Sequence, residues 1–269
     1  MSDRVLVSIS DGVADVRFNR ADKRNALDQE QFSAIAEAGE RLKSEPGVRV
    51  VVLSGDGASF CAGLDFSIFG QFADTSAGSG GPRIGTLTES GITHLAQQVC
   101  WVWQELPVPV IAAVHGHAIG GGAQIALGAD IRISTPGAKW SIREVHWGLI
   151  PDMTGTFVLS QLVRPDVAKE LTFTARMFDG AEAHALGVVT RLADDPYTAA
   201  HELAAEIAGR SPHAVRGVKA LYNRVFTQQA AEQFAMERQV IGGLIGTPNQ
   251  VEAITANLGN RPPVFTDPA

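Results

Sequence analysis

Two carboxylates stand in an apolar stretch of the sequence, where a solvated loop would be expected to contain more polar residues. The stretch is SIREVHWGLIPDMTGT, residues 141–156, and its carboxylates are Glu144 and Asp152. Burial among apolar side chains raises the pKa of a carboxyl group and suits it to act as a general acid or base. The stretch therefore indicates proton transfer. It leaves open the alternative that both carboxylates only cap turns or pair with Arg143.

Glycine-bearing loops follow two apolar, β-branched runs of the chain. Gly120–Gly122 follow the run 108–114, and Gly63 follows the run 48–53. Backbone N–H groups at a helix start bind a phosphate or a developing oxyanion. Loops that leave the carboxyl ends of parallel strands converge, so one N–H from each loop would form an oxyanion hole. The alternative is that the glycines only let helix and strand pack closely. Their spacing matches neither a dinucleotide-binding fingerprint nor a P-loop.

The elements that must position these groups follow an α/β pattern. Strand-like runs covered on both faces alternate with helical patterns, which is typical of a largely parallel sheet. These runs are residues 48–53, 108–114 and 130–134. The pair Asp11-Gly12 between two alternating stretches predicts an N-terminal β-hairpin.

From residue 156 onward the pattern is almost wholly helical. The longest helical candidates are residues 196–210, 212–226 and 230–244. We predict an α/β core over residues 1–195, which carries the site, and a helical region over residues 196–269. The Gly/Ser-rich stretch 74–82 is predicted to be a loop, either a lid or a plain surface loop.

Composition excludes several classes of protein. The chain has 269 residues, 45% of them hydrophobic, which is ample for a packed core. Its 22 basic and 29 acidic side chains give a formal charge of −7, which argues against general nucleic-acid binding. Because no apolar run is long enough for a signal peptide or a membrane span, we expect a cytoplasmic protein with no membrane partner.

Sulfur and imidazole side chains give little support for metal or thiol chemistry. Cys61 and Cys100 are predicted to be reduced, buried thiols, because two cysteines cannot build a disulfide framework or a four-ligand zinc site. His115 and His117 have a spacing that can place two imidazoles on one strand face, but no third ligand is near in sequence. His146 is interpreted either as a packed loop residue or as a substrate contact.

Five ordered motifs resemble the crotonase superfamily, the enoyl-CoA hydratases and isomerases, over nearly the whole chain. They are NRADKRNALD (19–28), GDGASFCAGLD (55–65), PVIAAVHGHAIGGGAQIALGADIRI (109–133), REVHWGLIPD (143–152) and NRPPVF (260–265). The resemblance implies an α/β core of repeated ββα units and a helical C-terminal trimerisation region over residues 196–269. It also implies homotrimers or hexamers, an acyl-CoA thioester substrate from fatty-acid metabolism, and no metal or redox cofactor.

Site residues are carried over from the family by their place in these motifs. The resemblance assigns the oxyanion-hole N–H groups to Leu64 and Gly121. It assigns CoA contacts to Lys23, Arg24, Ala26 and Ala62, and the two basic side chains suit the CoA phosphates. Acyl-chain contacts are expected from Phe66, Phe69, Trp147 and Met153.

The catalytic positions depart from those of a typical hydratase, which has two glutamates twenty residues apart. Here the first is Gln124 and the second is Glu144. A glutamine cannot act as a base, so efficient hydration is not expected. Asp152 lies where the dienoyl-CoA isomerases of the superfamily carry an essential aspartate. The leading hypothesis is therefore an enoyl-CoA or dienoyl-CoA isomerase in which Glu144 and Asp152 transfer protons and Gln124 orients them.

Two alternatives remain beside the isomerase hypothesis. The first is an enoyl-CoA hydratase that adds water to a 2-enoyl-CoA. The second is a homologue that binds acyl-CoA without turning it over.

Overall fold

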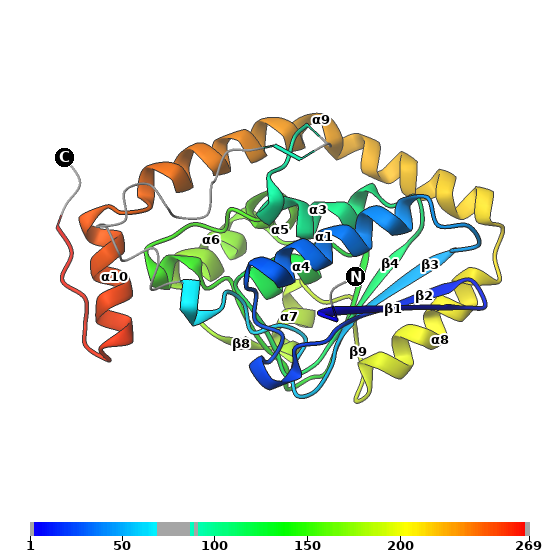
Figure 1. The fold of residues 1–269 in the computed structure, drawn as a ribbon, viewed down its shortest axis with the longest axis horizontal. Coiled ribbons are helices and arrows are strands. Elements are labelled where there is room, and N and C mark those ends of the chain that lie inside the picture. Colours follow the sequence, from blue (N-terminus) through cyan, green and yellow to red (C-terminus); the bar gives the residue numbers. More distant parts are fainter. Residues whose placement is uncertain (1–2, 69–86, 89–90, 267–269) are drawn as a thin grey trace.

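The computed structural model describes residues 3–68, 87–88 and 91–266 (Figure 1). Phe69 and the predicted loop 74–82 lie outside the described residues. The main sheet is built from β1 (Val5–Ser10), β2 (Val13–Phe18), β3 (Val50–Gly55), β4 (Val110–Val114), β6 (Ile131–Ser134) and β9 (Arg191–Leu192). A second, smaller sheet contains β5 (His117–Ile119), β7 (Lys139–Ser141) and β8 (Phe178–Asp179).

The main sheet has the order β1-β2-β3-β4-β6-β9, and every pairing except β1 with β2 is parallel. The antiparallel β1–β2 pair is the hairpin that the sequence predicts. Asp11 and Gly12 both have positive φ, 52° and 82°, as a tight two-residue turn of the twisted hairpin requires.

The helices cover both faces of this sheet and extend beyond it. They are α1 (Gln29–Lys43), α3 (Leu95–Glu105), α4 (Gly121–Leu127), α5 (Gly155–Leu162), α6 (Pro165–Thr174), α7 (Gly180–Leu186), α8 (Pro196–Ala208), α9 (Pro212–Leu244) and α10 (Pro248–Leu258). Short 3-10 turns, η1 (Ala21–Lys23) and η2 (Glu144–Trp147), lie in the loops. None of the helices in the described residues is long and apolar enough to cross a membrane.

Alternate residues of the central strands pack into two separate hydrophobic cores on opposite faces of the sheet. Val51 and Leu53 of β3 face the large core that contains α1 and α3, whereas Val50 and Val52 pack against Ala200 and Ala204 of α8. All four valine and leucine side chains are fully buried. The uninterrupted apolar run in β3 follows from this coverage on both faces.

The fold class predicted from the sequence is confirmed: an α/β core precedes a helical C-terminal region. One detail differs, because the two helices expected at 212–226 and 230–244 form the single 33-residue helix α9. Neither glycine nor proline interrupts the sequence between them. Figure 1 shows α9 running over the length of the molecule, with α10 at one end.

Helix α9 is attached to the core by a buried cation. Lys219 Nζ donates to Trp103 O at 2.8 Å and Val108 O at 2.9 Å, and it lies 2.7 Å from Asp130 Oδ2. Its three donors are thereby used, as burial of an ammonium group requires.

Because α8 packs on the sheet, this helix is part of the α/β core. The assignment of residues 196–269 to oligomerisation stays a prediction.

Candidate active site

Three glycines open α4 at a place where a side chain would collide with the neighbouring loops. A Cβ on Gly121 would lie 2.9 Å from Leu27 Cδ1 and 3.0 Å from Met153 Sδ. A Cβ on Gly122 would lie 2.3 Å from the backbone oxygen of Cys61. Gly120 has φ +52° and ψ −120°, a conformation that other residues rarely adopt. The glycines therefore let α4 begin in close contact with Leu27, Met153 and the Cys61 backbone.

The Gly63 loop touches this glycine turn. Gly63 has φ +89°, and a Cβ on it would lie 2.5 Å from Ile119 O and 3.9 Å from Gly121 N. Gly121 is the first residue of α4, so its N–H has no acceptor inside the helix. The structure thus brings the two predicted oxyanion-hole loops into contact.

The N–H of Leu64 points away from the strand-like contact that holds its loop. Leu27 N donates to Gly63 O at 2.8 Å, and Asp65 N donates to Leu27 O at 2.9 Å. Because successive N–H groups of an extended segment point to opposite sides, the Leu64 N–H faces away from Leu27. Within the described part of the chain, neither Leu64 N nor Gly121 N makes a hydrogen bond. Both are available to a ligand oxygen.

Gln124 holds the two ends of the carboxylate stretch together from inside α4. Its Nε2 donates to Glu144 Oε1 at 2.6 Å. Its Oε1 accepts from Met153 N at 3.0 Å and from Gly155 N at 2.9 Å. Since the amide oxygen accepts both backbone N–H groups, the amide nitrogen must face Glu144, and Glu144 must accept. Gln124 is fully buried, so this arrangement is held tightly.

Both carboxyl groups are shifted toward their protonated forms. Burial raises the pKa of Glu144 to about 7, against the opposing hydrogen bond from Gln124. Burial and the nearby charges of Glu237 and Glu144 raise the pKa of Asp152 to about 8. The second oxygen of Glu144, Oε2, is buried and lacks a hydrogen-bond partner among the described residues. Such groups accept or release a proton near neutral pH.

The alternative that these carboxylates only pair with Arg143 is not what the structure contains. Arg143 donates through Nη1 to Ala175 O at 2.6 Å, and no ion pair within the described residues joins it to Glu144 or Asp152. Glu144 is the first residue of the 3-10 turn η2, but no side-chain hydrogen bond caps this turn.

The segment matched to the family's CoA loop runs beside the Gly63 loop. Lys23 and Arg24 are exposed, Ala26 and Ala62 are half-buried, and Ala62 N donates to Arg24 O at 3.0 Å. The four predicted CoA contacts are therefore brought to one place. Asn25 is fully buried in the same turn and donates to Asp56 O and Ser59 O at 3.0 and 2.8 Å.

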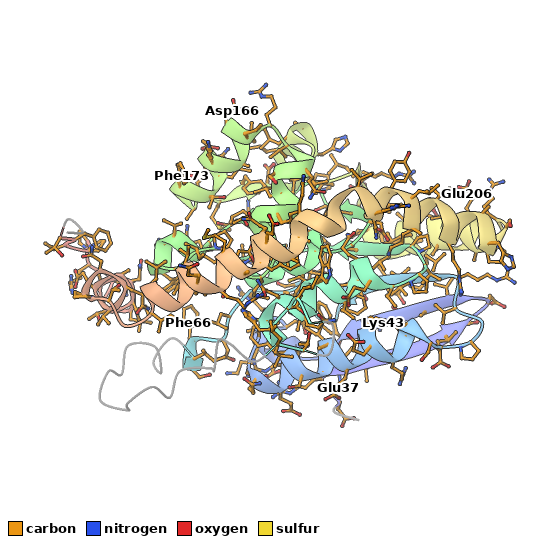
Figure 2. All side chains as sticks on the ribbon, turned by 90° about the horizontal axis from the view of Figure 1, so that it is seen from above. Glu37, Lys43, Phe66, Asp166, Phe173 and Glu206 are labelled. Carbon is orange, nitrogen blue, oxygen red and sulfur yellow. The ribbon has the colours of Figure 1, made fainter. Side chains whose placement is uncertain are left out.

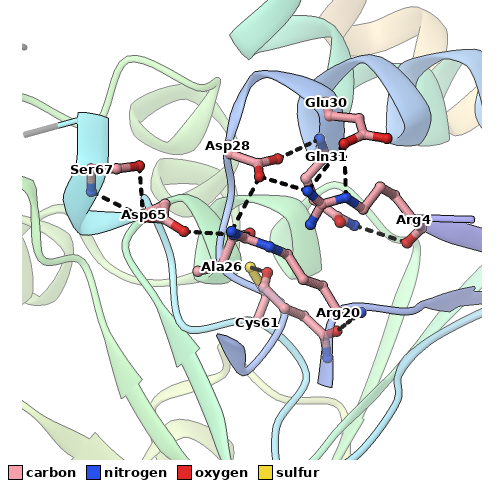
Figure 3. A network of polar contacts seen from close by, with 10 residues as sticks. Arg4, Arg20, Ala26, Asp28, Glu30, Gln31, Cys61, Asp65 and Ser67 are labelled. Atoms are coloured by element: carbon pink, nitrogen blue, oxygen red, sulfur yellow. Dashed lines mark hydrogen bonds and ion pairs between the residues drawn. The ribbon is translucent and has the colours of Figure 1, made fainter. Parts of the chain in front are cut away.

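Arg20 connects residues 20–28, which include the segment matched to the family's CoA loop, with the Gly63 loop, as Figure 3 shows. Arg20 Nη1 lies 2.6 Å from Asp65 Oδ2 and donates to Ala26 O at 2.9 Å, while Nη2 lies 3.2 Å from Asp28. The sequence analysis missed Arg20 and Asp65, although both lie within the quoted motifs. Their role is to connect residues 20–28 with Leu64.

The predicted acyl-chain residues are divided between the site and the surface. Met153 is buried against Gly121, and Trp147 packs in a small apolar cluster with Leu64 and Ile254 of α10. The Phe66 ring lies edge-on to Trp147, with centroids 5.8 Å apart, and its side chain is 65% exposed. Figure 2 shows Phe66 near the end of the molecule that carries α10.

The histidines and cysteines have ordinary partners. His115 Nε2 lies 2.9 Å from Gly57 O, and His117 Nδ1 lies 2.8 Å from Ser59 Oγ. In the described residues no group of three or more metal-ligating side chains comes together. Burial raises the pKa of Cys61 to about 12, so its thiol is not poised as a nucleophile. The His146 ring packs edge-on against Trp147, with 5.2 Å between the ring centroids.

Comparison with known proteins identifies the family. The enoyl-CoA hydratase/isomerase family matches residues 8–268, and the chain belongs to this family. Mouse mitochondrial methylglutaconyl-CoA hydratase is 32% identical over 261 residues, which is 94% of this chain and 79% of the relative. A Mycobacterium tuberculosis protein named "Probable enoyl-CoA hydratase EchA14" is 37% identical over 218 residues, covering 81% and 80% of the two chains.

A solved structure agrees with this assignment. The enoyl-CoA hydratase/isomerase from Pseudoalteromonas atlantica superposes with a TM-score of 0.84 at 26% identity, over 98% of this chain and 100% of that chain. Family membership therefore implies that the chain processes an acyl-CoA thioester. The relatives reported above are named hydratases, and the dienoyl-CoA isomerase subgroup expected from the sequence is not among their names.

Gly122→Ala should push the two oxyanion loops apart, because the new Cβ would lie 2.3 Å from a backbone oxygen that cannot move alone. We expect about a tenfold loss of affinity for an unreactive acyl-CoA thioester and a loss of about 1–3 kcal/mol in the free energy of unfolding. Calorimetric titration and urea unfolding measure these effects. Gly137→Ala is the control, since nothing lies within 4 Å of its Cβ. Equal affinity of the two variants would contradict the packing argument.

Proposed function

We propose that this chain is an enoyl-CoA or dienoyl-CoA isomerase that moves the double bond of its thioester substrate by proton transfer. The observation that carries the proposal is that Gln124 connects the buried Glu144 with the turn that follows the half-buried Asp152, and that the pKa values of both carboxyl groups are raised toward neutrality. Burial raises the pKa of Glu144 to about 7 and that of Asp152 to about 8, and we take Glu144, whose carboxylate accepts from Gln124, as the ionised group and Asp152 as the protonated one. One group is then a base and the other an acid, as removal and return of a proton at two carbons require.

The proposed reaction is written for the simplest substrate, a 3-enoyl-CoA. Glu144 removes a proton from the carbon next to the thioester, and the C–H electron pair forms a dienolate whose negative charge rests on the thioester oxygen. The N–H groups of Leu64 and Gly121 stabilise that oxygen, an effect of about 3–4 kcal/mol per donor. Asp152 then delivers its proton to C4, counting the thioester carbon as C1. The double bond thereby moves from C3–C4 to C2–C3, where it is conjugated with the thioester. Proton exchange with solvent restores both carboxyl groups.

Gln124 supports isomerisation rather than water addition. Syn addition of water needs a second basic or acidic group beside Glu144, and an amide supplies neither. Both lone-pair directions of the Gln124 oxygen are taken by the N–H groups of Met153 and Gly155, at 3.0 and 2.9 Å. The amide therefore has no acceptor left for a nucleophilic water.

The absence of a metal or redox cofactor and the cytoplasmic location stay predictions.

Glu144→Gln and Asp152→Asn should each lower kcat for conversion of a 3-enoyl-CoA by about 100-fold or more, since each removes one partner of the proton transfer. Gain of conjugated absorbance measures the rate. The value of kcat/KM should rise with pH up to about 7, as Glu144 ionises, and fall above about 8, as Asp152 loses its proton.

The control for these variants is Glu37→Gln, which neutralises an exposed carboxylate on α1 that Figure 2 labels. Full turnover by Glu144→Gln and Asp152→Asn would contradict the proposed roles. Tight acyl-CoA binding by the unaltered protein, with no turnover of any chain length, would establish the non-catalytic alternative.

Hydration of a 2-enoyl-CoA is the second candidate, which the names of the relatives favour. Gln124→Glu places a second carboxyl group 2.6 Å from Glu144 Oε1 and should raise the ratio of hydration to isomerisation. Loss of conjugated absorbance from a 2-enoyl-CoA measures hydration. Gln124→Ala, which adds no carboxyl group, is the comparison. If the unaltered enzyme hydrates 2-enoyl-CoA faster than it isomerises 3-enoyl-CoA, the isomerase proposal is wrong.

We infer that the chain assembles through α9, as the sequence expectation of homotrimers or hexamers requires. Val218, Leu221, Tyr222 and Val225 have the spacing of one helix face and are 52–69% exposed. A contiguous exposed apolar stripe of this kind is typical of a protein interface. Tyr222→Glu should shift the sedimentation coefficient toward that of a single chain, while Glu232→Gln on the same helix should not. An unchanged coefficient would exclude this face.

A further inference from the structure

Glu237 is a buried carboxylate that lies outside every motif of the family resemblance. It belongs to α9 and is 2% exposed. No ion pair within the described residues involves its carboxylate. A buried acid without a cation needs another explanation, because desolvation of a charge is costly.

Three donors whose orientation is fixed by their other contacts converge on Glu237. Thr156 Oγ1 donates to Oε1 at 2.5 Å, because Gln233 Nε2 already donates to that hydroxyl at 2.7 Å. Gln97 Nε2 donates to Oε2 at 3.1 Å, because the Gln97 oxygen accepts from Arg238 at 2.9 Å. Burial raises the pKa of Glu237, and these hydrogen bonds, which favour its charged form, oppose that rise.

The third donor is the backbone of the turn that follows Asp152. Thr154 N donates to Glu237 Oε2 at 3.1 Å, and the N–H groups on either side of it donate to Gln124. Thr154 has φ +70°, which is unfavourable for a β-branched residue. Three successive N–H groups are thus bound by two buried side chains, and these bonds fix a strained turn.

The charged and titratable groups around this turn come from α3, α9 and the 3-10 turn η2. Glu144 in η2, the Cys100 thiol in α3 and Glu237 in α9 interact with Asp152. His94 caps α3, and burial together with the charge of Arg238 lowers its pKa to about 4, so it is neutral. Arg238 donates to Ile92 O and to Gln97, at 2.7 and 2.9 Å. The charge of Glu237 acts on Asp152 and contributes to the raised pKa of that carboxyl group.

We propose that Glu237 is a positioning residue for Asp152: its carboxylate binds the Thr154 N–H, fixes the turn after Asp152 and adds a charge to the surroundings of that side chain. The inference rests on the proposed function only where it takes Asp152 as the proton donor of the reaction. Its geometric part involves Thr154, Thr156 and Gln97 and stands independently of the reaction.

The test compares Glu237→Gln, which keeps the size of the side chain but removes its charge, with Glu232→Gln, which removes an exposed charge from the same helix. In Glu237→Gln we expect the alkaline limb of the kcat/KM profile to shift to lower pH by about half to one pH unit, because loss of the charge lowers the pKa of Asp152. We also expect kcat to fall about threefold to tenfold with KM unchanged. Glu232→Gln should match the unaltered enzyme. Glu237→Asp should keep the alkaline limb in place and lower kcat.

A second readout does not depend on turnover. The infrared band of a protonated carboxyl group that disappears in Asp152→Asn can be followed against pH in the unaltered protein and in Glu237→Gln. A lower titration midpoint in Glu237→Gln supports the inference even if the protein turns over no 3-enoyl-CoA, in which case only the proposed function fails. An unchanged midpoint, in a protein that does isomerise, overturns the inference alone. If Glu237→Gln does not fold, full kcat in Glu237→Asp overturns it, and a lower kcat with the alkaline limb unchanged supports it.

Discussion

The buried amide of Gln124 is the interaction on which the geometry of the two carboxyl groups depends. Glu144 and Asp152 lie eight residues apart in one loop stretch, and the Gln124 side chain connects its two ends through Glu144 Oε1 and the N–H groups of Met153 and Gly155. The amide can do so because the glycines before it bring α4 within contact of the Cys61 loop. The same packing brings Glu144 close to the glycine turn, since a Cβ on Gly120 would lie 3.2 Å from Glu144 Oε1.

Burial of these carboxyl groups opposes stability at neutral and alkaline pH. A carboxyl group whose folded-state pKa lies above its unfolded value binds more protons in the folded state, so the free energy of unfolding falls as the pH rises between the two values. For Glu144 this window runs from 4.5 to about 7, and for Asp152 it runs from 3.8 to about 8. The large core around β3 and β4 must offset this cost. Strain at Thr154 and a buried Glu237 in the same region are consistent with a site kept in place by its surroundings.

Local patterns in the sequence predict the strands, the hairpin at Asp11-Gly12 and the meeting of the two glycine loops, since each is set by neighbouring residues. Family resemblance adds the places of Glu144 and Asp152. Neither source reveals Glu237, because an acid within a long helix resembles a solvated residue until tertiary packing covers it. The same limit applies to Gln124: its type argues against a base, but the two N–H groups that fill its oxygen come from a segment about thirty residues later, and only the fold brings them together.

Residues 20–28 connect substrate binding with the oxyanion hole. The exposed Lys23 and Arg24 give this acidic protein a local positive surface, whereas the opposite side of the same turn is fixed by Asn25 and Arg20. Arg20 reaches Asp65, and the hydrogen bonds of Leu27 on either side of Leu64 determine which way its N–H points. A ligand whose phosphates draw Lys23 and Arg24 toward it would act on a segment that is hydrogen-bonded to the Leu64 loop. The binding energy of a remote, unreactive part of the substrate can therefore serve to orient the N–H that stabilises the reacting oxygen.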